Sequence, residues 1–218
     1  MDCGRDRCTT PSISPNGTRI AYSREAAGPS PDLPSGSPRI WILDLPSGQN
    51  SAVYEDQQIL GYGPTWSPDS TKLASFDGLA DLIRLFDLKT KQQYIFQSNT
   101  GGPITWSPDS TKMLFTKIEQ KEDGLRSLVR IADIPLNDSS TLIGAKDERD
   151  YSYYSLAWSP VEDSVVLGFR MSDDKPAQVF WLFDPGILDG IIIADARGDV
   201  RLINPAATRL LNTSQGAV

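Results

Sequence analysis

Trp66-Ser67-Pro68-Asp69-Ser70-Thr71-Lys72 returns almost unchanged as the segment at residues 106–112. A less exact copy stands at residues 158–164, and a copy without the tryptophan stands at residues 13–19. We call each copy a Ser-Pro box. A signature that repeats at intervals of about 40 to 50 residues is typical of an array of similar units. The repeat therefore predicts a chain built from four related units.

A second element follows each Ser-Pro box. It is a short β-branched or aromatic run that ends in aspartate, at residues 39–44, 82–87, 128–133 and 179–184. Such runs are typical of strands that are buried on most of both faces. One strand is expected directly after each box, another after the aspartate turn, and a short one before the box. Four antiparallel strands in each unit predict the blades of a β-propeller.

The box itself has the chemistry of a tight turn. Pro68 fixes φ at the first corner, and Asp69 and Ser70 can satisfy the backbone of the turn. Trp66 is expected to bury its ring between neighbouring blades. We therefore interpret the box as a hairpin and not as a nucleophile site. The structural residues of the repeat are Trp66, Pro68, Asp69, Trp106, Pro108, Asp109, Trp158 and Pro160.

These boxes resemble the repeats of TolB-type, WD-repeat-like bacterial β-propellers, over roughly residues 9–186. The family pattern has glycine where Ser70 and Ser110 stand, and the fourth box has Val161 in place of its aspartate. The resemblance implies a protein-binding module, since most members are of that kind and many work outside the cytoplasm. Related propellers also cap serine peptidases.

The sequence thus predicts an all-β protein, a β-propeller of about four four-stranded blades. The expected blades are residues 9–56, 61–98, 101–146 and 152–186. Four blades is the low end for propellers, which have about 4 to 8. We therefore expect a fragment of a longer protein or an incomplete ring, whose exposed strand edges would favour self-association.

Both ends of the chain differ from the repeats. Residues 1–8 contain both cysteines, Cys3 and Cys8, and are expected to form a frayed terminus in which the thiols are unpaired or loosely bridged. Residues 187–218 contain no box, and two interpretations stay open. A strand, a glycine turn, a second strand and the helix start at residues 204–211 resemble the opening of a PAS sensor domain, over about residues 187–214. Residues 200–203 also echo residues 83–86, which indicates a partial fifth blade.

The composition of the chain excludes several classes of function. The 218 residues carry a formal net charge of -7, which argues against nucleic acid and anionic membrane surfaces as partners. The chain contains no histidine, so catalysis by a histidine base and zinc sites with histidine ligands are excluded. We expect no enzyme, no cofactor and no metal. We expect no signal peptide, because the first residues contain no apolar segment, and no run approaches the ~18 apolar residues of a membrane helix. The resemblance suggests the bacterial periplasm or cell envelope if the chain is a fragment, and the cytoplasm otherwise.

The leading functional prediction is a non-catalytic scaffold that binds a protein or peptide. One alternative is the input segment of a signalling protein with a truncated PAS domain. Another is the propeller cap of a hydrolase whose catalytic half is absent from this chain.

The candidate binding patch lies four residues before two of the box tryptophans, at Tyr62 and Tyr154. Both should begin the innermost strand of a blade and face the mouth of the central channel. The preceding connectors add charged and aromatic residues, namely Glu55, Asp56, Arg149, Asp150, Tyr151 and Tyr153. Aromatic rings beside charges on a rigid rim are typical of protein contact sites. The alternative is that these rings fill space between blades.

Overall fold

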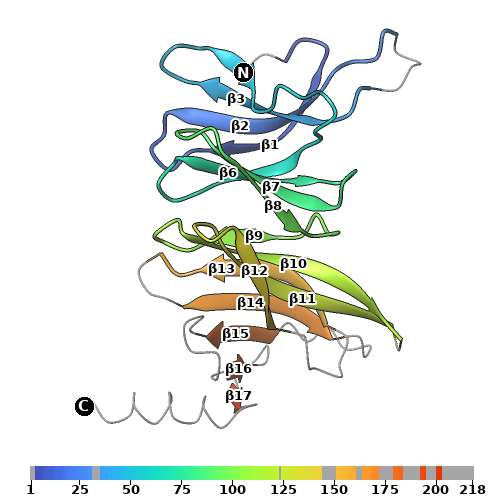
Figure 1. Cartoon of the computed structure of the whole chain (residues 1–218), viewed down its shortest axis with the longest axis vertical. Helices are drawn as coiled ribbons and strands as arrows, with labels where there is room; N and C mark the ends of the chain where they lie inside the picture. The colour runs from blue at the N-terminus through green and yellow to red at the C-terminus, as the bar shows by residue number, and fades with distance from the viewer. Residues whose placement is uncertain are drawn as a thin grey trace. The chain divides into compact units, whose positions relative to one another are not determined.

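The computed structural model describes residues 3–30, 35–122, 124–143, 151–160, 164–171, 179–183, 192–194 and 200–202 (Figure 1). Their regular secondary structure consists of β-strands arranged in four antiparallel sheets, which confirms the predicted fold class. No pairing that would close these sheets into a ring is found between the described strands. No described helix is long and apolar enough to cross a membrane. The chain forms two compact units, residues 1–101 and 102–218.

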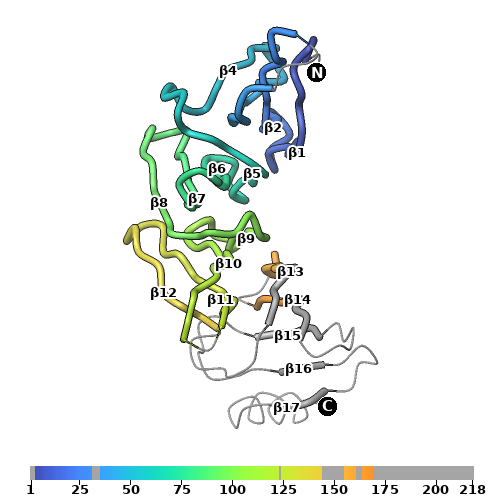
Figure 2. Tube along the Cα trace, turned by 90° about the vertical axis from the view of Figure 1, so that its right-hand side faces the viewer, coloured from blue at the N-terminus to red at the C-terminus, as the bar shows by residue number. Residues whose placement is uncertain are grey.

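The first unit holds two four-stranded sheets whose strands follow each other in chain order (Figures 1 and 2). The first sheet consists of β1 (Arg7–Ile13), β2 (Arg19–Glu25), β3 (Arg39–Asp44) and β4 (Asn50–Ala52). The second sheet consists of β5 (Tyr62–Trp66), β6 (Lys72–Asp77), β7 (Leu82–Asp87) and β8 (Gln93–Gln97). Each sheet corresponds to one copy of the predicted repeat.

The second unit holds the other two sheets. The third sheet consists of β9 (Ile104–Trp106), β10 (Lys112–Lys121), β11 (Gly124–Asp133) and β12 (Asp138–Ile143). The fourth has five strands, β13 (Tyr151–Trp158), β14 (Val165–Met171), β15 (Val179–Phe183), β16 (Ile192–Ala194) and β17 (Val200–Leu202). Its last two strands, β16 and β17, come from the tail, which the predicted repeat does not cover.

The Ser-Pro box is a closed turn between the first two strands of a sheet. The Ser67 backbone N–H donates to the Lys72 carbonyl at 3.0 Å, and the Lys72 N–H donates to the Ser67 hydroxyl at 2.9 Å. The Asp69 carboxylate accepts the Thr71 N–H at 3.0 Å and the Ser67 hydroxyl. Burial alone would raise the pKa of Asp69, but these hydrogen bonds outweigh it and lower the pKa to about 2. The box is therefore a hairpin turn, as its sequence predicts.

The backbone conformation at the fifth position of the box explains why the similar propeller repeats have glycine there. Ser70 and Ser110 both have φ of 61°, and Gly17 has φ of 71° at the same position of the first box. This left-handed conformation is one that glycine adopts without steric cost. Ser70 compensates in part, because its hydroxyl accepts the backbone N–H of Asn16 from the neighbouring sheet at 3.0 Å.

The core of the first unit lies between its two sheets. Trp66 is 7% exposed and belongs to a buried cluster with residues of β2, β3 and β6. Its indole Nε1–H donates to the Ser12 carbonyl of β1 at 2.9 Å. A tryptophan between neighbouring blades is therefore confirmed for this box.

Both ends of the chain require corrections to the sequence-based predictions. Cys3 and Cys8 form a disulfide, which is the bridged alternative of the prediction. The frayed terminus is wrong for Arg7 and Cys8, because β1 begins at Arg7 and places both residues in the first sheet. In the tail, β16 pairs with β15, and β17 pairs with β16. These strands belong to the fourth sheet rather than to a separate fifth blade, and the PAS-like interpretation is unsupported. The expected helix start at residues 204–211 lies outside the described residues.

Candidate partner-binding cleft

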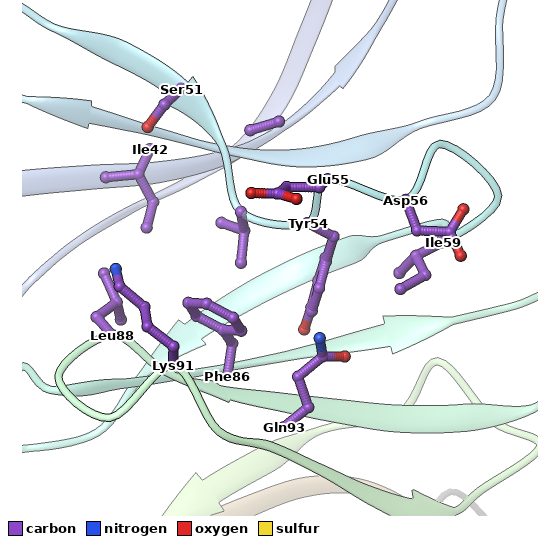
Figure 3. Close-up of a pocket in the computed structure, with 12 residues that line it drawn as sticks. Ile42, Ser51, Tyr54, Glu55, Asp56, Ile59, Phe86, Leu88, Lys91 and Gln93 are labelled. Atoms are coloured by element: carbon purple, nitrogen blue, oxygen red, sulfur yellow. The ribbon is translucent and has the colours of Figure 1, made fainter.

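A cleft of about 680 Å³ lies between the two sheets of the first unit (Figure 3). One wall comes from β3, β4 and the connector that follows β4, residues 53–61. The other wall comes from β7, β8 and the turn between them. The cleft is therefore formed where two successive sheets of the repeat stack on each other.

The floor of the cleft is apolar. Ile42 is buried, and Val53 and Leu88 are half-buried and pack against the core cluster that contains Trp66. Phe86 is half-buried and lies between Lys91 and Tyr54 in Figure 3. Because the floor continues the core between the sheets, its side chains are held by packing on their far side.

Tyr54 supports the floor. It is 5% exposed, and its ring meets Phe86 edge to face, with 5.6 Å between the ring centroids and 79° between the planes. Burial raises the pKa of Tyr54 to about 12, against a smaller lowering by the hydrogen bond with Ser75. The phenol therefore stays neutral at physiological pH, and it serves as a packing group rather than a proton carrier.

Arg39 fixes the connector that forms the rim. Its Nη2 donates to the backbone carbonyl of Tyr54 at 2.8 Å and reaches the carbonyl of Asp56 at 3.5 Å. The Asp56 carboxylate accepts the backbone N–H of Gln58 at 2.8 Å, which closes a local turn. The rim carboxylates therefore project from a segment with a defined backbone.

The rim carries charges of both signs from different sheets. Glu55 and Asp56 are exposed on the connector, whereas Lys91 is exposed on the turn between β7 and β8 (Figure 3). The Lys91 Nζ lies 5.8 Å from the centroid of the Phe86 ring, within the range of a cation–π contact. Glu55 makes no hydrogen bond or ion pair with any residue that the structure describes. Its carboxylate is thus available to a partner.

The predicted site residues fall into three groups. Glu55 and Asp56 line the cleft. Tyr62 begins β5 and is 43% exposed, but it does not line the cleft; it lies beside Gly78 and pairs across the sheet with Phe76. The remaining predicted residues are in or before β13 of the other unit. The strand begins at Tyr151, so the prediction that Tyr154 begins it is wrong, and Tyr151 and Tyr153 belong to the strand rather than to the connector. Arg149 and Asp150 lie outside the described residues.

Sequence reasoning missed the second wall of the cleft. The sequence predicts only a strand at residues 82–87 and a turn after it, whereas in the structure Phe86, Leu88 and Lys91 line the cleft opposite the connector of the preceding sheet. The available signal was the repeat itself, because stacked blades bring the turn after the third strand next to the preceding connector.

Among the described residues, no three His, Cys, Asp or Glu side chains are grouped so that they could hold a metal ion. The cleft offers apolar contact and charge.

No protein-family model and no curated protein matches this chain. Solved β-propeller structures do match it. TolB from Acinetobacter baumannii is 20% identical over 93% of this chain and 44% of that chain, with a TM-score of 0.54. The β-propeller domain of the Trilobed protease from Pyrococcus furiosus is 16% identical over 92% of this chain and 58% of that chain, with a TM-score of 0.58.

A third match is dipeptidyl peptidase 4 from Porphyromonas gingivalis, 11% identical over 90% of this chain and 32% of that chain, with a TM-score of 0.63. The chain thus spans less than two thirds of each of these three proteins. At such identities the likeness shows the fold alone. The chain has the β-propeller fold, and it is structurally similar to TolB and to other β-propeller domains.

Proposed function

We propose that this chain is a non-catalytic β-propeller scaffold that binds a protein or peptide partner. The observation that carries the proposal is the cleft of the first unit, where an apolar floor meets an exposed carboxylate, Glu55, that has no partner within the described residues. Interfaces commonly combine an apolar centre with a polar rim. A connector held by Arg39 presents this rim at low entropic cost.

The test installs a photo-crosslinking residue in place of Gln57, which is exposed on the connector. The matched control places the same residue at Ser47, which is exposed on the turn between β3 and β4. Irradiation in the source cells should give a cross-linked protein for position 57 and not for position 47. The cross-linked protein is then purified, and its binding to the wild-type chain is measured directly. Equal labelling from both positions would contradict the proposal.

The proposed contact surface also includes Tyr62 at the start of β5. Tyr62→Ala should weaken binding of that purified partner by roughly 1 to 2 kcal/mol, the range of a buried aromatic contact. Because Tyr62 is 43% exposed in the free chain, its replacement should change the melting temperature little. The same result is expected for Tyr154→Ala. A large loss of stability in either variant would show that the ring is part of the core.

The absence of catalysis is part of the proposal, and the lack of histidine in the chain supports it. Assays with peptide, ester and phosphate substrates should give no turnover above buffer. Turnover that disappears on substitution of a single carboxylate would overturn this part.

A second candidate is the propeller cap of a hydrolase. The similarity to the dipeptidyl peptidase and to the β-propeller domain of the Trilobed protease favours it; this chain spans 32% of the first and 58% of the second, which is itself only a propeller domain. A coding sequence that continues into a Gly-x-Ser-x-Gly segment would support this candidate. Continuation into further Ser-Pro boxes alone would favour the scaffold.

The disulfide between Cys3 and Cys8 supports a location in an oxidising compartment, such as the bacterial envelope. Disulfides persist outside the cytoplasm and are reduced within it. Thiol alkylation of the protein, taken from its source cells under acid quench, should therefore label neither cysteine.

A further inference from the structure

The charge and shape of the cleft narrow the kind of partner. We propose that it binds an extended polypeptide segment in which an aliphatic or aromatic side chain stands next to a lysine or arginine. This inference rests on the proposed function and specifies the chemistry of the partner. Three features of the cleft carry it: the apolar floor, the acidic connector and the edge of β4.

The floor accommodates an apolar side chain. The volume of about 680 Å³ lies within the ~300 to 1,000 Å³ range of protein binding pockets. The half-buried Phe86 and Leu88 expose apolar surface there, and Tyr54 holds the Phe86 ring from behind. An incoming aliphatic or aromatic group would cover this surface and continue the core between the sheets.

The charges favour a basic neighbour for that group. Glu55 and Asp56 are adjacent and exposed on the connector, and Glu55 has no partner among the described residues. Lys91, on the other wall, already lies over the Phe86 ring. A lysine or arginine at the connector would therefore be attracted, whereas an acidic residue would be repelled. The net charge of -7 adds long-range attraction for a basic segment.

The edge of β4 favours a polypeptide over a small molecule. The Val53 N–H donates to the Ile40 carbonyl at 2.9 Å, and the Asp44 N–H donates to the Gln49 carbonyl at 2.8 Å. In an antiparallel pair, successive residues alternate between facing the neighbouring strand and facing away from it. Ala52 lines the cleft and, by this alternation, directs its N–H and C=O to the free edge of the sheet. An extended segment could add to this edge while its side chains enter the cleft.

The experiment measures binding of labelled peptides to the whole chain by fluorescence anisotropy at low ionic strength. The first probe is an acetylated octapeptide in which one phenylalanine is flanked by lysines in a Ser/Gly background. The second replaces lysine by glutamate, and the third replaces phenylalanine by serine. We expect the first probe to bind at least about fivefold more tightly than either of the others, a difference of about 1 kcal/mol.

The matched variants are Glu55→Gln in the cleft and Glu122→Gln, which removes the same charge from the exposed turn after β10. Glu55→Gln should weaken the lysine probe about threefold to tenfold, as expected for a close charge pair, and Glu122→Gln should leave it unchanged. Lys91→Gln should not weaken it. A benzophenone in place of the probe's phenylalanine should label residues 51–59 and 86–93.

Equal binding of the lysine and glutamate probes, or equal effects of the two glutamine variants, would overturn the inference. If the glutamate probe labels the cleft as well as the lysine probe does, the charge preference is wrong but a protein-binding cleft remains. If no probe binds while the residue-57 crosslinker still captures a partner, the apolar–basic segment is wrong and the proposed function stands. These outcomes separate failure of the inference from failure of the proposed function.

Discussion

The box tryptophans allow a matched test of the hydrogen bond between the first two sheets. Trp66 and Trp106 are each 7% exposed and occupy the same position of their boxes. The Trp66 Nε1 donates to the Ser12 carbonyl at 2.9 Å, whereas the Trp106 Nε1 is buried and has no hydrogen-bond partner among the described residues. Trp66→Phe and Trp106→Phe therefore remove the same ring volume but differ in what happens to the indole N–H.

The difference in unfolding free energy follows from that N–H. Trp66→Phe loses a hydrogen bond worth about 1 kcal/mol, while Trp106→Phe removes an unpaired donor whose burial costs about 1 to 3 kcal/mol. The loss of ring volume is shared by both variants and cancels in the comparison. Trp66→Phe should therefore be less stable than Trp106→Phe by about 2 to 4 kcal/mol.

Urea unfolding of the two variants and the wild type measures this difference. Because the chain has two compact units, hydrogen exchange of β6 and β10 should be followed as well, to assign each loss to its own sheet. Equal stabilities, or a less stable Trp106→Phe, would refute the assigned role of the bond to Ser12.

Three further predictions concern the turns and the first strand. Both Ser70→Ala and Ser70→Gly lose the hydrogen bond from the Asn16 N–H, but only Ser70→Ala keeps a Cβ in the unfavourable left-handed conformation, at φ of 61°. Thermal unfolding should therefore show Ser70→Gly to be the more stable variant by about 1 kcal/mol. The folded-state pKa of Asp69, about 2, lies below its usual 3.8, so its stabilising contribution is complete above pH 3.8 and is lost as pH falls through 2; the difference in urea midpoint between wild type and Asp69→Asn should shrink over that window. Reduction of the Cys3–Cys8 disulfide, which joins residues 5 apart, should cost about 2 kcal/mol, and a variant with both cysteines replaced by serine should not respond to reductant.

The elements that sequence reasoning located well are those with local causes. The expected strands at 39–44 and 82–87 coincide with β3 and β7, and the box turn closes through hydrogen bonds between residues no more than six positions apart, such as Ser67 and Lys72. Turn residues and the alternation of buried and exposed side chains depend only on residues a few positions apart. A single sequence is therefore sufficient to locate these strands and turns. Because these local patterns recur four times along the chain, they together indicate the fold class.

The cleft and the tail could not be derived in the same way. The two walls of the cleft join Glu55 to Phe86 and Lys91, more than 30 positions later in the chain, and their meeting depends on how two sheets stack. Tyr54 and Glu55 are neighbours in sequence, yet one is buried and the other exposed. In the tail, the pattern strand–turn–strand fits several arrangements, and only the pairing of β16 with β15 assigns it to the fourth sheet.

The connector between the first two sheets is held in place by the first sheet. At its start, the Val53 N–H is bonded to the Ile40 carbonyl at 2.9 Å, and at its end the Gly61 N–H is bonded to the Pro38 carbonyl at 3.0 Å. A Cβ on Gly61 would lie 2.2 Å from Cγ1 of Ile40, so only glycine permits this close approach. The connector is thus fixed at both ends by the first sheet and in the middle by Arg39. Its exposed side chains can vary without loss of the fold, whereas its backbone cannot. Specificity for a partner would therefore depend on residues such as Glu55, which contribute little to the stability of the chain itself.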